Sequence, residues 1–407
     1  MQVTATPPEA LAPEAAPGAV DAPTGAAAVR AAAGAVTATV AVVVPVFLLG
    51  GLSVLIARDL HFSPAGLGAL VSVYFGVGAL CAVPTGRLVE RYGARRTIRA
   101  GIVLAAVTML LIAVAARSYA TLFALIALAG AANGLGQLGS NLSVARSVPA
   151  HRQGVAFGVK QAAIPISTLV AGLAVPTVGL TLGWRWAFGL AALLACAALF
   201  ALPPDHGASR RGQPAQRASR TGALVVVSIA GVLGSGTANA LGSFLVSSAV
   251  DRGISEGTAG LVLAAGSALG IAGRIGAGWL ADRRAGGHLL VVTGMLALGA
   301  GGLALLAVPG HVALVVGTLA GFGLGWAWPG LLNFAVVRIE RDAPAAATSI
   351  TQTGVYAGGA AGPLAFGALV HATSYSTAWL ASAAVMVLAA ALMVLGRKLL
   401  LAPLPPR

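Results

Sequence analysis

One pattern of polar residues and apolar runs occurs twice in this chain, and the two copies lie 192 positions apart. The repetition indicates an internal duplication, because the matches include Asp, Asn and Arg, which are scarce in this chain. The matching pairs are Asp59/Asp251, Ser63/Ser255, Gly86/Gly278, Glu90/Asp282, Arg91/Arg283, Asn141/Asn333 and Arg146/Arg338. Two parallel copies of a helical membrane unit are typical of transporters whose binding site lies between the copies.

The composition excludes a soluble protein. Of the 407 residues, 58% are hydrophobic and 9% are charged, whereas a soluble domain carries about 25% charged residues. Such sparse charge cannot cover a surface that faces water, so lipid must be the solvent. The net charge of +14 does not indicate nucleic-acid binding, because the basic residues lie in short loops between apolar runs, as the positive-inside rule predicts.

Twelve apolar runs are long enough to cross a bilayer, which requires about 20 residues. They form two groups of six, at 35–57, 66–86, 98–116, 119–142, 154–180 and 184–203, and at 222–250, 258–281, 288–308, 311–337, 345–371 and 376–396. We therefore predict an all-α membrane protein with twelve transmembrane helices in two pseudo-symmetric bundles. The predicted segments are a disordered cytoplasmic tail (1–34), a first bundle (35–203), a cytoplasmic linker (204–221), a second bundle (222–398) and a cytoplasmic tail (399–407).

The distribution of basic residues predicts the orientation. If both termini and the linker lie in the cytoplasm, nineteen Lys and Arg residues fall on the cytoplasmic side and four fall on the outer side. Arg58, Arg117, Arg185 and Arg252 are the four outer ones. This bias predicts a multi-pass protein of the plasma membrane with both termini in the cytoplasm.

The loop after the second predicted helix carries the most specific motif. It contains Gly86, Leu88, Glu90, Arg91, Gly93, Arg95 and Arg96, and a partial copy with Gly278, Leu280, Asp282 and Arg283 follows the eighth helix. In this motif and in its twelve-helix pattern, the chain resembles the major facilitator superfamily over residues 35–398. The resemblance implies two six-helix bundles, alternating access, and a gate in which the acid of the motif faces the positive end of a helix in the other bundle. Glu90 stands where the family usually has Asp.

A second motif leaves the substrate class open. Gly358, Gly362, Pro363 and Gly367 resemble the glycine–proline motif of drug/proton antiporters, but they lie in the eleventh helix rather than the fifth. The fifth helix instead contains Lys160, Gln161 and Pro165. The resemblance therefore extends to the fold and the gate, and not to the drug-export mechanism.

Ionisable residues inside the bilayer are costly and usually functional. All eleven acidic residues fall in the predicted tail, in loops or at helix ends, whereas Lys160 and Arg274 lie within helices. An unpaired buried cation becomes tolerable when it faces a watery cavity and binds an anion, and the fork of Arg suits a carboxylate. Arg274 also resembles a basic residue in the eighth helix of monocarboxylate-type members. These cations predict an anion site.

Other polar or aromatic residues can line the same cavity or bond between helices. We expect Tyr74, Asn133, Gln137, Gln161, Asn239, Trp326, Gln352 and Tyr356 at the substrate site with Lys160 and Arg274. Pro165, Pro176 and Pro329 are candidates for helix breaks, which alternating access requires.

The chain shows no motif for catalysis, nucleotide binding or metal binding, so we expect no enzymatic activity, cofactor or metal. The first hypothesis is a carrier of a small organic or inorganic anion. The alternative is an exporter of a drug or metabolite, and a membrane sensor without transport is the third. The expected partners are the lipid bilayer and a small anionic substrate, without nucleic acid, and the expected state is a monomer.

Overall fold

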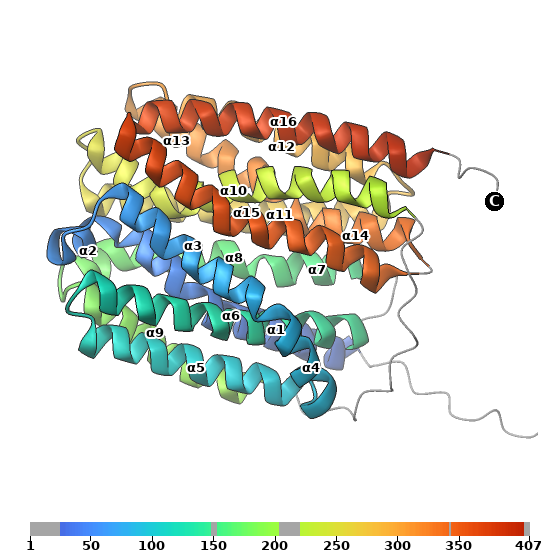
Figure 1. Ribbon diagram of the computed structural model, residues 1–407, viewed down its shortest axis with the longest axis horizontal. Coiled ribbons are helices and arrows are strands. Elements are labelled where there is room, and N and C mark those ends of the chain that lie inside the picture. Colours follow the sequence, from blue (N-terminus) through green and yellow to red (C-terminus); the bar gives the residue numbers. More distant parts are fainter. Residues whose placement is uncertain (1–24, 148–152, 203–219, 342, 403–407) are drawn as a thin grey trace, which may run out of the picture.

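The computed structural model describes residues 25–147, 153–202, 220–341 and 343–402, and within these ranges it contains helices and no strand. The helices run along one direction and form two groups (Figure 1). The first half of the chain, in blue and green, forms the lower group, and the second half, in yellow to red, forms the upper group. This arrangement agrees with the expected pair of bundles.

The first bundle contains nine α-helices and two short helices of other types among the described residues. They are α1 (Gly25–Gly51), α2 (Ser53–Leu60), α3 (Pro64–Leu80), α4 (Ala82–Tyr92), α5 (Ala94–Ala115), α6 (Tyr119–Ser147), α7 (Gln153–Gln161), α8 (Ala163–Ala174), the π-helix η2 (Val175–Gly179), α9 (Trp184–Ala198) and the 3₁₀-helix η3 (Leu199–Ala201).

The second bundle has fewer interruptions. It contains α10 (Thr221–Asp251), α11 (Glu256–Arg283), α12 (His288–Leu305), α13 (His311–Ala320), the π-helix η4 (Gly321–Gly325), α14 (Pro329–Ile339), α15 (Pro344–Ala372) and α16 (Tyr375–Leu401). Within the described ranges, eleven helical segments are long and apolar enough to cross a membrane, or twelve if α2 and α3, which meet at 111°, count as one span.

The spacing of 192 residues holds for the helices as well as for the polar residues. The α6 helix covers Tyr119–Ser147, and α13 to α14 cover His311–Ile339, with the same offset at both ends. The repeated serines cap equivalent helices: Ser63 accepts a hydrogen bond from the backbone N–H of Gly66, and Ser255 accepts one from Thr258. Such caps satisfy a backbone donor that lacks a partner in the first turn.

Two predicted boundaries differ from the structure. The α1 helix begins at Gly25, so residues 25–34 continue the first helix and do not belong to a disordered tail. This segment is rich in alanine, which has the highest helix propensity. The α16 helix ends at Leu401, so residues 399–401 extend the last helix into the predicted tail. Residues 1–24 and 203–219 lie outside the described ranges.

The two bundles meet through close backbone contacts at glycines. A Cβ atom at Gly68 in α3 would lie 2.4 Å from the carbonyl oxygen of Pro363 in α15, and one at Gly367 would lie 2.4 Å from that of Pro64. The Ser72 hydroxyl donates to the Ala360 carbonyl across the same contact. Part of the predicted glycine–proline motif therefore serves the contact between the bundles.

We call the end of the molecule that carries Gly93 and the residues 284–287 and 340–341 the basic end. The end that carries the residues 61–63, 180–183 and 252–255 is the opposite end. At the opposite end, Arg58 in α2 and Glu256 in α11 form an ion pair of 2.6 Å between the bundles. A second ion pair, of 2.8 Å, joins Arg185 to Asp59 within the first bundle, and Trp184 donates to the same carboxylate.

Candidate functional site

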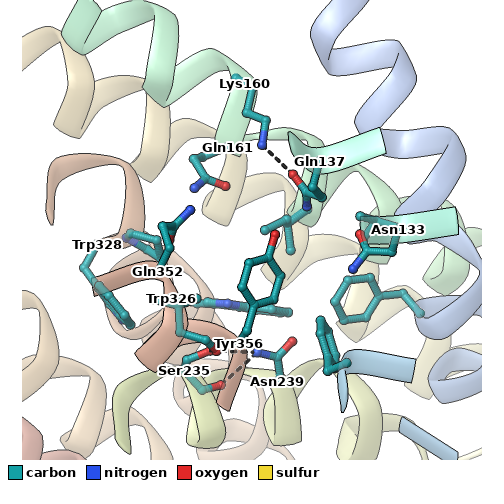
Figure 2. Close-up of a pocket in the computed structure, with 16 residues that line it drawn as sticks. Asn133, Gln137, Lys160, Gln161, Ser235, Asn239, Trp326, Trp328, Gln352 and Tyr356 are labelled. Atoms are coloured by element: carbon teal, nitrogen blue, oxygen red, sulfur yellow. Dashed lines mark hydrogen bonds between the residues drawn. The ribbon is translucent and has the colours of Figure 1, made fainter. Parts of the chain in front are cut away.

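A cavity lies between the bundles and is lined by residues of α1, α3, α6, α7, α8, α10, α14 and α15, with two more from the segment between η4 and α14 (Figure 2). Its volume is about 60 Å³, which is room for a few water molecules. The bundles must therefore part further before a larger molecule can enter. The lining residues are Val43, Phe47, Phe75, Asn133, Gln137, Lys160, Gln161, Ile164, Ser235, Asn239, Trp326, Trp328, Pro329, Gln352, Val355 and Tyr356.

Equivalent positions of the two repeats line the cavity. Five pairs of lining residues are related by the 192-residue offset: Val43/Ser235, Phe47/Asn239, Gln137/Pro329, Lys160/Gln352 and Ile164/Tyr356. The positions are equivalent, but the side chains are not. In particular, Lys160 and Gln352 occupy matching places on α7 and α15, so the charge enters the cavity from the first bundle alone.

Among the described residues, Lys160 is the only charged one in this lining, and no carboxylate of these residues accompanies it. Its side chain is 2% exposed, and its ammonium donates to Oε1 of Gln137 at 2.5 Å. In Figure 2 this pair lies above the phenol end of Tyr356, with Ser235 and Asn239 below the ring. The cavity therefore has a positive side near Lys160 and an uncharged polar side near Asn239.

Aromatic side chains form much of the remaining wall. Phe47 of the first bundle and Trp326 of the second meet edge to face, with their ring centroids 5.6 Å apart. Phe75 packs edge to face against Tyr74 at 5.0 Å. Such rings provide flat apolar faces on which an aromatic ligand can stack.

Two buried polar groups of the lining have no hydrogen-bond partner among the described residues. They are Oδ1 of Asn133 and the indole N–H of Trp328. Asn239, by contrast, donates to the carbonyl and to the hydroxyl of Ser235, at 2.9 and 3.1 Å. Buried polar groups are normally hydrogen-bonded, so the unpartnered atoms indicate that a polar ligand or water completes this site.

The structure brings eight of the ten expected site residues together and places two outside the lining. Tyr74 is buried behind the wall and donates from its hydroxyl to the carbonyl of Val42 at 2.7 Å. Arg274 is 2% exposed, and its guanidinium donates to the carbonyls of Gln161 at 2.6 Å and Trp326 at 2.8 Å.

Two helix interruptions, one caused by Pro165 and one between η4 and α14, explain why these carbonyls accept a side chain. Proline has no N–H, so Pro165 cannot donate to the carbonyl of Gln161 four residues earlier, and α7 ends there. Trp326 lies in the interruption between η4 and α14, which begins at Pro329. The third expected proline, Pro176, lies in the π-helix η2. Arg274 thus satisfies backbone groups that interrupted helices leave free inside a membrane.

The expected gate residues lie at the basic end. Gly93 joins α4 to α5 with a φ of 85°, a conformation that favours glycine, and it is followed by Arg95 and Arg96 in the first turn of α5. Arg91 lies over the ring of Tyr92 at 5.2 Å. Gly86 has open space beside its Cα, and the side chain of Glu90 lies outside the described parts of the structure.

The second copy of the motif joins the two bundles. Oδ2 of Asp282 accepts the backbone N–H of Val155 at 2.9 Å, in the first turn of α7, where backbone donors lack partners and the helix dipole is positive. Gly278 lies close to Gly158 of α7, and Arg283 lies over the ring of Trp279 at 3.9 Å. The acid of the second copy therefore lies at the first turn of a helix of the other bundle, and its role in a gate stays a prediction.

Asp282→Ala removes the acceptor from the first turn of α7 and is expected to destabilise the protein by about 1 kcal/mol, as the loss of a helix cap does. Asp282→Asn keeps an oxygen acceptor, so it should lose less than half as much stability as Asp282→Ala. Thermal unfolding of the purified variants measures the difference. An alanine variant as stable as the unmodified protein would contradict this role.

The sequence interpretation missed the apolar part of the cavity. Val43, Phe47, Phe75 and Ile164 carry no polar group that marks them as site residues. The internal repeat contained a usable signal, because Phe47 lies 192 positions before the expected site residue Asn239, and Ile164 lies 192 positions before Tyr356.

Comparison with known proteins agrees with the fold and the repeat. The chain matches the model of the Major Facilitator Superfamily over residues 29–343 and 227–407. It is also similar to a chloramphenicol resistance protein of Streptomyces lividans, with 28% identity over 329 residues that cover 78% of this chain and 83% of the relative.

The family match spans both bundles, and the described helices provide the membrane-crossing segments that such a protein requires. It confirms the family and the fold class expected from the repeated loop motif. The chain belongs to the Major Facilitator Superfamily of membrane transporters.

Proposed function

We propose that this transporter exports small aromatic molecules that are uncharged or anionic, and that it discriminates against cations. The observation that carries the proposal is the composition of the central cavity: the lining residues that the structure describes provide one ammonium, several carboxamides and aromatic rings, and no carboxylate. A cation in this cavity would meet Lys160 without an acid to offset the repulsion. An anion or a strong hydrogen-bond acceptor would gain a charge-assisted hydrogen bond from the same group.

Export, rather than uptake, is supported by the chloramphenicol resistance protein among the similar chains. Transport would proceed by alternating access, with the basic end toward the cytoplasm of the cell, as the bias of basic residues favours. The molecule would act as a monomer, because its cavity is enclosed by the two bundles of one chain.

The test is uptake into inside-out vesicles that contain the protein, in which export appears as accumulation. Chloramphenicol serves as an uncharged aromatic probe, benzoate as an aromatic anion and benzyltrimethylammonium as an aromatic cation. We expect chloramphenicol, benzoate or both to accumulate more than about fivefold above the level in vesicles without the protein. Benzyltrimethylammonium should remain at the background level. Accumulation of the cation alone would overturn the proposal.

A small non-aromatic monocarboxylate is the second candidate substrate. The observation in its favour is that Arg274 donates to the carbonyl of Gln161, the residue next to Lys160, so that two buried basic side chains lie near each other. Exchange of labelled formate or lactate in the same vesicles, without transport of the aromatic probes, would favour this candidate.

A further inference from the structure

Arg274 connects two interrupted helices that belong to different bundles. Its contact with the carbonyl of Gln161 crosses from α11 to the end of α7 in the first bundle, and its contact with the carbonyl of Trp326 remains within the second bundle. The side chains of Gln161 and Trp326 both line the central cavity. The guanidinium therefore holds the backbone of two opposite cavity walls at a fixed distance.

The contact between α7 and α11 extends from the cavity to the basic end. Arg274 lies next to the cavity, and the bond from Val155 to Asp282 lies two turns of α11 closer to the basic end. Between them, α7 and α11 pack so closely that a Cβ atom at Gly158 would lie 2.8 Å from the carbonyl oxygen of Arg274. These three contacts together form what we call the α7–α11 seam.

Any movement that opens the basic end along this seam must break the bond from Arg274 to Gln161. The bond to Trp326 can persist, because Arg274 and Trp326 move together with the second bundle. Opening would leave the Gln161 carbonyl without its donor, since Pro165 cannot replace it. A charge-assisted hydrogen bond of this kind stabilises the closed arrangement more than a neutral one does.

We propose that Arg274 is a latch that closes the α7–α11 seam and thereby sets the balance between the open and closed states of the basic end. Its role is to position the two bundles, and it does not contact the substrate. The residue 192 positions earlier is Ala82. Its side chain has no hydrogen-bond donor, so the equivalent position of the first bundle cannot form the same hydrogen bonds. The proposal depends on the transporter fold and is independent of the substrate class.

The test is hydrogen–deuterium exchange, followed by mass spectrometry, of the full-length protein in lipid nanodiscs without substrate. In Arg274→Gln we expect exchange to rise by about tenfold in α7 and at the start of α14, which corresponds to the loss of one charge-assisted hydrogen bond. At the opposite end we expect slower exchange in α2, because the open basic end favours the closed opposite end and its Arg58–Glu256 pair.

Two further variants separate the latch from a general effect on folding. Arg274→Lys keeps the charge but lacks the planar fork that reaches two carbonyls, so it should give an intermediate rise. Gly158→Ala should separate α7 from α11 and raise exchange in α7 but not at the start of α14, since it leaves the bond from Arg274 to Trp326 intact. Either exchange in α7 that does not change in Arg274→Gln, or a uniform rise over both bundles without slower exchange in α2, would overturn the proposal.

Discussion

Replacing Gly362 by alanine is expected to lower the melting temperature of the purified protein by several degrees. A Cβ atom at this position would lie 2.2 Å from the Cα of Gly236 in α10, well inside van der Waals contact. The neighbour is backbone, so it cannot move aside as a side chain would. Overpacking of this kind costs about 1–3 kcal/mol, and sometimes more, because α10 and α15 must move apart where they pack against each other.

Gly301→Ala is the matched control, because it makes the same chemical change in a helix of the same bundle. No atom outside the helix lies within 4 Å of the added Cβ at this position, and alanine favours a helix by up to about 1 kcal/mol over glycine. This variant should melt at the same temperature as the unmodified protein or higher. Equal melting temperatures for the two variants would refute the close contact of α10 with α15.

Lys160→Gln is expected to reduce the affinity for an aromatic anion such as benzoate by about tenfold to a hundredfold. A hydrogen bond to a charged group contributes about 1.5–3 kcal/mol, and each 1.4 kcal/mol corresponds to a factor of ten. The amide of glutamine can still bond to Gln137, so the cavity should remain folded. Isothermal titration calorimetry measures the affinity for benzoate of the purified unmodified protein and of the purified variant.

The symmetry of the cavity supplies the control for this variant. Gln352 occupies the position that matches Lys160 in the second bundle, without a charge. Gln352→Leu should reduce the affinities for uncharged and anionic ligands to a similar extent. Lys160→Gln should reduce the affinity for benzoate more than that for chloramphenicol. If Lys160→Gln reduces the affinities for both ligands equally, the charge of Lys160 does not select the substrate.

Much of the fold could be predicted from the sequence because membrane helices are encoded by length and apolarity. The repeated Ser63 and Ser255 could be matched before the structure was known, and both cap a helix. The start of α1 could not be predicted from apolarity. Residues 25–34 form a helix, but most of them are alanine and few carry a large apolar side chain.

The role of Arg274 illustrates what the sequence leaves undetermined. Its burial and lack of a nearby acid in the sequence suggested an anionic partner, since isolated buried cations are costly. The structure supplies backbone carbonyls instead. Pro165 indicates from the sequence that the Gln161 carbonyl lacks its helical donor, but only the packing of α11 against α7 determines which side chain reaches it.

The most direct test of the central claim is a reversal of charge preference at Lys160. Benzoate and benzyltrimethylammonium, which share a ring and differ in charge, are compared by the thermal stabilisation that each gives to the protein. The unmodified protein should be stabilised by benzoate and not by the cation, and Lys160→Glu should show the opposite preference. Stabilisation of the unmodified protein by the cation, or a preference that Lys160→Glu leaves unchanged, would contradict the claim that this ammonium selects the substrate.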